Sequence, residues 1–125
     1  MTAALAAATL PRPLDPGEAF FFLQDHISCM NFVVFAERTG HLEPGRIQAA
    51  LDLIQQENQL LQASISWTDT TGLRFEPAPG QPVTLQIRRC GAQDWQGWIE
   101  HELSQPFATG TAPLMRCLYL ELVAP

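Results

Sequence analysis

The most constraining feature of this sequence is its last apolar stretch, Leu114 to Leu122, which is apolar on both alternating faces. Leucines recur on one face, methionine, cysteine and tyrosine on the other, and only Arg116 and Glu121 interrupt them. A strand that is covered on both sides has this composition. We therefore expect a central strand of a sheet, with a packed layer on each face.

Length and charge narrow the class of protein. The chain has 125 residues, which suits one domain with one core, and its hydrophobic content of 46% is typical of globular proteins. The net charge is -6, and the basic residues are seven scattered arginines. This composition does not predict a phosphate-binding surface, so we set nucleic-acid binding aside.

Cysteine usage and the N-terminus bear on location. The three cysteines, Cys29, Cys90 and Cys117, are widely spaced and form no CxxC pair, so we expect reduced thiols in a cytoplasmic protein. Residues 1–13 are alanine-rich but lack the features of a signal peptide, and they predict a flexible N-terminal arm. No apolar stretch approaches the length of a membrane span.

Residues 14–125 are predicted to form one lobe. The order of Asp15, Pro16 and Glu18 indicates a capping box and a helix to about His26. Apolar spacing predicts a second helix at 44–61 and a third, capped by Asp94, that carries an apolar stripe. Strands are expected at 31–39, 63–68, 73–75 and 83–87, with a turn at 69–72 and a loop at 77–82.

The predicted order is helix, strand, helix, three strands, helix and strand. This order predicts an α/β (α+β) two-layer sandwich, in which helices pack on a mixed, mostly antiparallel sheet. We find no internal repeat and no internal domain boundary.

Three stretches, in order along the chain, carry a family resemblance. RPLDPGEAFFF resembles the motif R-x-L-S-x-x-E-x-x-F at Arg12, Leu14, Glu18 and Phe21 or Phe22. HLEPGRIQAALDLIQQENQLLQASI resembles a helix-and-strand motif at Leu42, Ile47, Ala50, Leu51, Leu60, Leu61, Ala63 and Ile65. QPFATGTAPLMRCLYL resembles x-P-F-D-L-x-x-x-P-L-L-R-A-x-L at Pro106, Phe107, Pro113, Leu114 and Arg116. The chain thus resembles the N-terminal lobe of the chloramphenicol-acetyltransferase-like superfamily.

This superfamily includes condensation domains of nonribosomal peptide synthetases and polyketide-associated alcohol acyltransferases. The resemblance implies an enzyme that moves an acyl group from a thioester on coenzyme A or a carrier protein to an alcohol or amine. The expected partners are that thioester, whose carrier is phosphopantetheine or coenzyme A, the acceptor, and a second, C-terminal lobe. No tightly bound cofactor is implied.

The chain also departs from the family. Asn58 and Gln59 stand where the family has His-Pro, Gln62 replaces arginine and Ala108 replaces aspartate, which indicates a divergent member. The active-site motif HHxxxDG, whose second histidine deprotonates the acceptor or stabilises the intermediate, is absent and would lie shortly beyond Pro125. We therefore expect a lobe that is truncated before its active-site motif and is inactive by itself.

No other residues form a convincing catalytic or metal site. None of His26, His41 and His101 is followed by an aspartate at the motif spacing, so we expect solvated or locally hydrogen-bonded histidines. His26 and Cys29 have the spacing of two metal ligands, but no second pair lies nearby in the sequence. Ser64 and Ser66 lack the glycines of a nucleophile elbow.

The other singled-out residues have a structural interpretation beside a functional one. The aromatic block Phe20 to Phe22 either contacts an acyl chain or packs in the core. Core packing is also expected for Trp95 and Trp98, and an ion pair for Arg116. Helix capping is favoured over substrate contact for Arg12, Asp15 and Glu18.

Two functions follow from these observations. The first is the N-terminal part of an acyltransferase or condensation enzyme in nonribosomal peptide or polyketide biosynthesis. The alternative is a non-catalytic, free-standing half-lobe that dimerises or binds a carrier protein, because the two lobes of the superfamily resemble each other and two copies of one lobe could pair.

Overall fold

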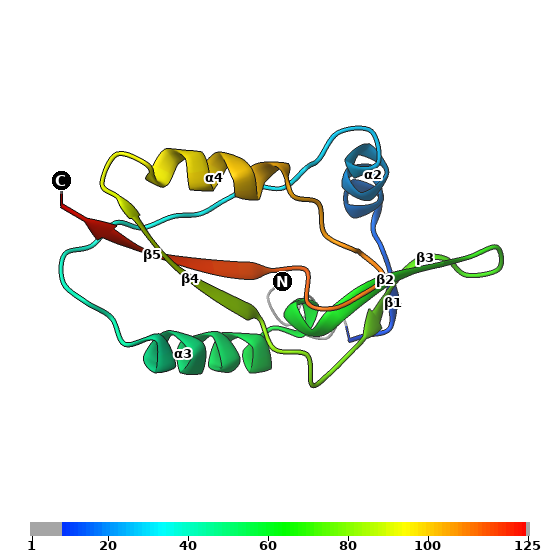
Figure 1. The fold of residues 1–125 in the computed structure, drawn as a ribbon. Helices are drawn as coiled ribbons and strands as arrows, with labels where there is room; N and C mark the ends of the chain where they lie inside the picture. The colour runs from blue at the N-terminus through cyan, green and yellow to red at the C-terminus, as the bar shows by residue number, and fades with distance from the viewer. Residues whose placement is uncertain (1–8, 125) are drawn as a thin grey trace.

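The computed structural model describes residues 9–124, which form helices and strands (Figure 1). The elements are, in order, β1 (Arg12–Pro13), α2 (Pro16–Asp25), α3 (Pro44–Glu57), the 3-10 helix η1 (Gln59–Gln62), β2 (Ala63–Thr68), β3 (Gly72–Pro77), β4 (Thr84–Gly91), α4 (Trp95–Ser104) and β5 (Arg116–Val123). Helices lie against strands, and antiparallel strand pairs outnumber the parallel pair. The predicted α/β fold class is confirmed.

The strands form two sheets. In the first, β3 is central and pairs antiparallel with β1 and β2, with Ile65 opposite Phe75. A turn over 69–71 joins β2 to β3 as predicted, and Gly72 has a φ of 70°, a conformation that glycine adopts without a steric penalty. The strands predicted at 63–68 and 73–75 are therefore confirmed as a hairpin.

The second sheet pairs β4 with β5 in parallel, from Thr84 opposite Arg116 to Gly91 opposite Val123. Parallel neighbours need a long crossover, and α4 supplies it. Figure 1 shows α4 and α3 on opposite sides of this sheet. No residue of β5 is fully buried by the described part of the chain, so the expected packing of a layer on each face of β5 is not borne out there.

Two predictions about strands were wrong: the position of one strand in its sheet and the existence of another. Among residues 9–124, β5 pairs only with β4, so it lies at an edge of its sheet and is not central. The segment 31–39, predicted as a strand, has no regular structure. Alternating apolar residues report which faces are buried, but a strand exists only where a neighbour supplies hydrogen bonds.

Helix boundaries follow local capping. The capping box of α2 is confirmed, since the Glu18 amide donates to Asp15 Oδ1 at 2.8 Å and the Asp15 amide donates to Glu18 Oε1 at 2.8 Å. The predicted helix at 44–61 ends earlier, because extended backbone at Asn58 separates α3 from η1. Asp94 is the N-cap residue of α4 as predicted, but its side chain makes no capping hydrogen bond.

The N-terminal prediction is only partly covered. Residues 1–8 of the predicted arm lie outside the described residues, and Arg12–Pro13 form β1. No described helix has both the length and the apolar character required to cross a membrane.

Few apolar side chains are fully buried among the described residues, and they come from α3, the hairpin, β4 and the residue before β4. They are Leu51, Ala63, Phe75, Val83 and Cys90. One polar side chain, Gln55, is buried with them and donates through Nε2 to the carbonyls of Leu61 and Gln81. This amide therefore joins α3 to η1 and to the loop before β4.

Candidate functional site

The first motif of the sequence forms an ion pair that joins β1 to α2. Arg12 donates to both carboxylate oxygens of Glu18, at 2.9 and 3.0 Å, and Glu18 also accepts the Asp15 amide. The guanidinium stacks over the buried ring of Phe75, 4.8 Å from its centroid. The predicted helix-capping role of Asp15 and Glu18 is confirmed, and Arg12 ties this cap to the hairpin.

These contacts shift both ionisation equilibria. The hydrogen bond from Arg12 holds the pKa of Glu18 below its usual value, and the same bond raises the pKa of Arg12. A carboxylate that accepts a bidentate guanidinium is stabilised in its charged form. The cluster is thus a fixed ion pair at neutral pH, without a free acid or base.

A second cluster lies where β5 begins. Arg116 donates through Nε to the Glu102 carboxylate at 2.5 Å and through Nη2 to the carbonyls of Glu102 and Gln105, at 2.9 and 2.7 Å. Asn31 donates to the same two carbonyls, and the Phe107 ring lies 4.3 Å from the guanidinium carbon. The expected structural pair for Arg116 is confirmed. The cluster satisfies the C-terminal carbonyls of α4.

The three histidines do not form a catalytic group with one another. His26 caps α2, contacts the Phe22 carbonyl through Nδ1 at 2.9 Å and packs edge-on against the Phe22 ring. His41 is 3.4 Å from Glu43 and 3.7 Å from Glu121, and its side chain is 56% exposed. His101 is exposed in the last turn of α4. Each lies on a different element, so the structure brings none of them together.

The remaining polar candidates do not form a reactive group. Within residues 9–124, no three of the side chains that ligate metals come together. Cys29 is a free thiol, and burial raises the pKa of the Cys117 thiol. Ser66 donates to Glu76 across the hairpin, which orients its hydroxyl within the sheet.

The aromatic predictions are corrected by the exposure of the side chains. Phe20 and Phe21 are 59% and 57% exposed, so neither ring is part of the core. Trp95 and Trp98 are half-buried, and Trp95 packs against Phe35 with ring centroids 5.5 Å apart.

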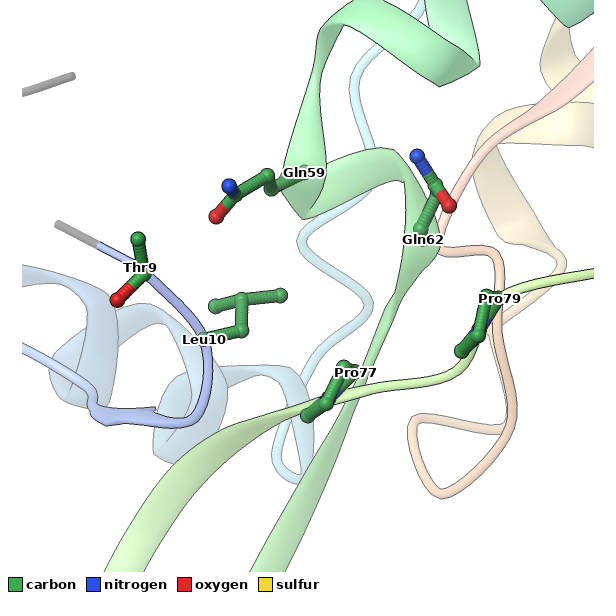
Figure 2. Close-up of a pocket in the computed structure, with 6 residues that line it drawn as sticks. All are labelled: Thr9, Leu10, Gln59, Gln62, Pro77 and Pro79. Atoms are coloured by element: carbon green, nitrogen blue, oxygen red, sulfur yellow. The ribbon is translucent and has the colours of Figure 1, made fainter. Parts of the chain in front are cut away.

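One shallow pocket lies between the N-terminal segment, η1 and the end of β3 (Figure 2). Its volume is about 230 Å³, and it is lined by Thr9, Leu10, Gln59, Gln62, Pro77 and Pro79. These residues include no carboxylate, imidazole or thiol. The pocket offers hydrogen bonds and apolar contact but no acid, base or strong nucleophile.

The comparisons with known proteins find related structures. No protein-family model and no curated protein matches the chain. The starter condensation domain of rhizomide synthetase, in a double mutant described as being in a "product-released" conformation, matches 69% of the chain at 26% identity and a TM-score of 0.57. Mutants of the same domain solved with C8-CoA, one of them also with Leu-SNAC, match 100% of the chain at 18–20% identity and a TM-score of 0.67.

The chain has the fold of a condensation-domain fragment. It spans 20% of the product-released structure and 30–31% of the complexes with C8-CoA. The resemblance of the sequence to the chloramphenicol-acetyltransferase-like superfamily is thereby confirmed at the level of the fold.

The residues that depart from the family motifs make local contacts in this chain. Asn58 donates to the Ile54 carbonyl and Gln62 donates to the Gln55 carbonyl, so both amides satisfy the end of α3. The Ala108 carbonyl accepts the amide and the hydroxyl of Thr111 in the loop before β5. Asn58 and Gln62 therefore have a structural use at their positions, whereas the contact at Ala108 is made by its backbone and does not explain the alanine.

Three residues that make important contacts in the structure were not found from the sequence. Asn31 and Glu102 complete the Arg116 cluster, and Gln55 is the buried polar side chain of the core. Asn31 is 74 positions from Gln105, Glu102 is 14 positions from Arg116, and Gln55 is 6 and 26 positions from Leu61 and Gln81. The only signal in the sequence was Arg116, a single arginine on an otherwise apolar strand. A buried arginine needs a carboxylate partner, but the sequence does not identify which carboxylate it is.

The depressed pKa of Glu18 predicts a pH dependence of stability. Its folded pKa lies below the unfolded value, so the ion pair stabilises the fold at neutral pH, and this contribution is lost as pH falls through the folded pKa. Glu18→Gln should lower Tm at about pH 7 and lose the difference from the parent near about pH 3. Thermal unfolding by circular dichroism measures this, with Glu57→Gln, at the exposed end of α3, as the control. An equal deficit at both pH values would contradict the assignment.

The Arg116 cluster predicts a larger cost than other ion pairs of the same sheet. Arg116→Met leaves the Glu102 carboxylate, 16% exposed, without its cation and should cost about 2 kcal/mol in urea unfolding. Arg89→Met is a matched control on β4, because Arg89 is 73% exposed and should cost less than about 0.5 kcal/mol. Equal effects of the two substitutions would contradict the structural role of Arg116.

Proposed function

We propose that this chain is the N-terminal part, residues 14–125 with a preceding arm, of an acyltransferase of the condensation type. The complete enzyme transfers an acyl group from a coenzyme A or carrier-protein thioester to an amine or alcohol. The chain supplies part of the scaffold, and the histidine that removes the acceptor proton belongs to a motif outside it. In this proposal the enzyme is cytoplasmic, as its free thiols suggest.

The observation that carries the proposal is the fold match over the whole chain to a part of one known domain. The match covers 100% of this chain but only 30–31% of the condensation domains solved with C8-CoA. A chain that matches over its whole length but covers less than a third of the matched domain has the size expected of one part of a lobe. The three family motifs along the sequence support the same proposal independently.

The arrangement of side chains also supports it. Motif residues Arg12 and Glu18 hold α2 to the hairpin, and motif residue Arg116 holds α4 to β5. None of these residues is left free for proton transfer. In this proposal these residues stabilise the scaffold around the active site, and the groups that react belong to another part of the enzyme.

An acyl-transfer assay tests the proposal. The product of the complete reading frame should convert C8-CoA and Leu-SNAC, the pair bound by one related domain, to the acylated amino-acid thioester, detected by mass spectrometry. The 125-residue chain alone should give no product above the buffer rate. An HHxxxDG motif is expected in the frame after Pro125, and replacing its second histidine by alanine should lower the rate by at least about a hundredfold. A frame without that motif would contradict the proposal.

Self-association is the second candidate, and the exposed apolar surface favours it. The side chains of Ile27, Phe32 and Val34 are 81%, 83% and 86% exposed. Exposed apolar side chains that lie close together in the sequence are typical of a surface that binds another protein. A half-lobe that paired with a second copy would cover these side chains.

Light scattering of the 125-residue chain distinguishes this candidate. A natural dimer should persist at sub-micromolar concentration, whereas Val34→Asp should convert it to monomer because a carboxylate would be buried in the interface. Gln56→Asp, on the exposed side of α3, is the control and should leave the mass unchanged. A monomer at all concentrations would rule out a free-standing dimer.

A further inference from the structure

The pocket in Figure 2 is formed by segments that the fold holds beside one another. Because β1 pairs antiparallel with β3, Leu10 lies beside Pro77. The Ala78 amide donates to the Gln62 carbonyl at 2.7 Å, which joins the loop after β3 to η1. Gln62 also donates through Nε2 to the Gln55 carbonyl, at 2.8 Å, and so joins η1 to α3. The walls of the pocket are therefore in place before a ligand binds, which lowers the entropy cost of binding.

Both glutamines of the pocket are residues at which this sequence departs from the family motifs. Gln59 stands where the family has proline, and Gln62 stands where it has arginine. A proline side chain has no hydrogen-bonding group, and an arginine would bring a positive charge to the wall. The neutral amides of this pocket are thus a property of this chain, and the resemblance to the family does not predict them.

Gln59 supplies the hydrogen-bonding group that a ligand would meet. Figure 2 shows its side chain extending from η1 toward Thr9 and Leu10. The neighbouring amides of Asn58 and Gln62 donate to carbonyls of α3, whereas the Gln59 amide makes no hydrogen bond to another residue of 9–124. A free carboxamide donates through nitrogen and accepts through oxygen, so it can bind the C=O of one peptide group and the N–H of another.

The other walls of the pocket are largely apolar. Leu10, Pro77 and Pro79 contribute carbon surface, and neither proline has an amide N–H. None of the six lining residues is ionisable. A carboxylate, a phosphate or an ammonium group would therefore lose its water in this pocket without gaining an ion pair. This chemistry selects a neutral ligand that has both hydrogen-bonding and apolar groups.

We propose that this pocket binds a short neutral peptide segment, whose backbone is hydrogen-bonded by Gln59 and whose small side chains lie against Leu10, Pro77 and Pro79. An extended peptide alternates amide groups with side chains, which matches an amide placed among apolar walls. The volume of about 230 Å³ is smaller than that of sites for drug-sized ligands, so it suits one or two residues. The proposal goes beyond acyl transfer and does not depend on it, because the pocket contains no reactive group.

An NMR titration with a capped amino acid tests the proposal. The probe is N-acetylalanine N-methylamide, which is neutral and has two peptide groups and one methyl side chain. In the ¹⁵N-labelled 125-residue chain, the side-chain NH₂ signals of Gln59 should shift to saturation with a Kd of about 1–10 mM. The NH₂ signals of Gln56, on the exposed side of α3, should not move. Signals of Gln59 that do not respond to the probe would overturn the proposal.

A pair of substitutions tests the role assigned to Gln59. Gln59→Leu removes the amide but keeps a side chain of similar size, and it should weaken binding of the probe by about fivefold. Gln56→Leu is the matched control, because Gln56 is also exposed but lies outside the pocket, and it should leave the Kd unchanged. Backbone amide signals show whether both variants keep the fold. Equal Kd values for the two variants would contradict the role of Gln59.

Two analogues of the probe test the class of ligand. N-acetylalanine methyl ester lacks one N–H donor and should bind more weakly than the methylamide by at least about twofold. N-acetylalanine carries a carboxylate at neutral pH and should bind more weakly still. Equal binding of the ester would mean that apolar contact alone holds the ligand, and tighter binding of the carboxylate would mean that the pocket prefers an anion. Either result would overturn the proposal.

The product of the complete reading frame shows whether the pocket is open in the whole protein. Saturation-transfer NMR should detect the same probe on that product, with a weaker signal for Gln59→Leu than for Gln56→Leu. Binding by the 125-residue chain alone would overturn the proposal, because another part of the protein would then cover the pocket. Acyl transfer without probe binding would defeat only the peptide pocket, and probe binding without acyl transfer would defeat only the proposed activity.

Discussion

The structure depends most on the way Arg116 is satisfied. One guanidinium, placed on an otherwise apolar strand, binds the Glu102 carboxylate and two carbonyls at the end of α4. Breaking this partly buried pair is expected to cost about 2 kcal/mol, a large part of the stability of a small domain. The arginine therefore fixes the position of α4 on the sheet, and Asn31 brings the extended segment to the same point.

Few apolar side chains are buried in this structure, and many are exposed. Only five hydrophobic side chains are buried among the described residues, while phenylalanines at 20, 21, 32 and 35 are more than half exposed. A domain of this length buries roughly two thirds of its unfolded surface. The two sheets meet at their ends and do not stack face to face, and one helix lies on each side of the sheet of β4 and β5, so much apolar surface stays exposed among the described residues.

The family motifs have a common physical meaning in this part of the fold. Arg12 with Glu18, and Arg116 with Glu102, are each an arginine fixed by a carboxylate across two elements. Both guanidiniums also stack on an aromatic ring, Phe75 in one case and Phe107 in the other. Arginine suits these positions because its planar fork donates in several fixed directions while its face rests on carbon.

The sequence by itself determined the elements that local interactions stabilise. The capping box of α2, the periodicity of α3 and the turn of the β2–β3 hairpin could all be predicted, because their partners lie within a few positions. Only the tertiary structure decided the partner of Arg116, the edge position of β5 and the unpaired state of residues 31–37. Those features depend on contacts across many residues, and an apolar pattern specifies that a face is covered without specifying by what.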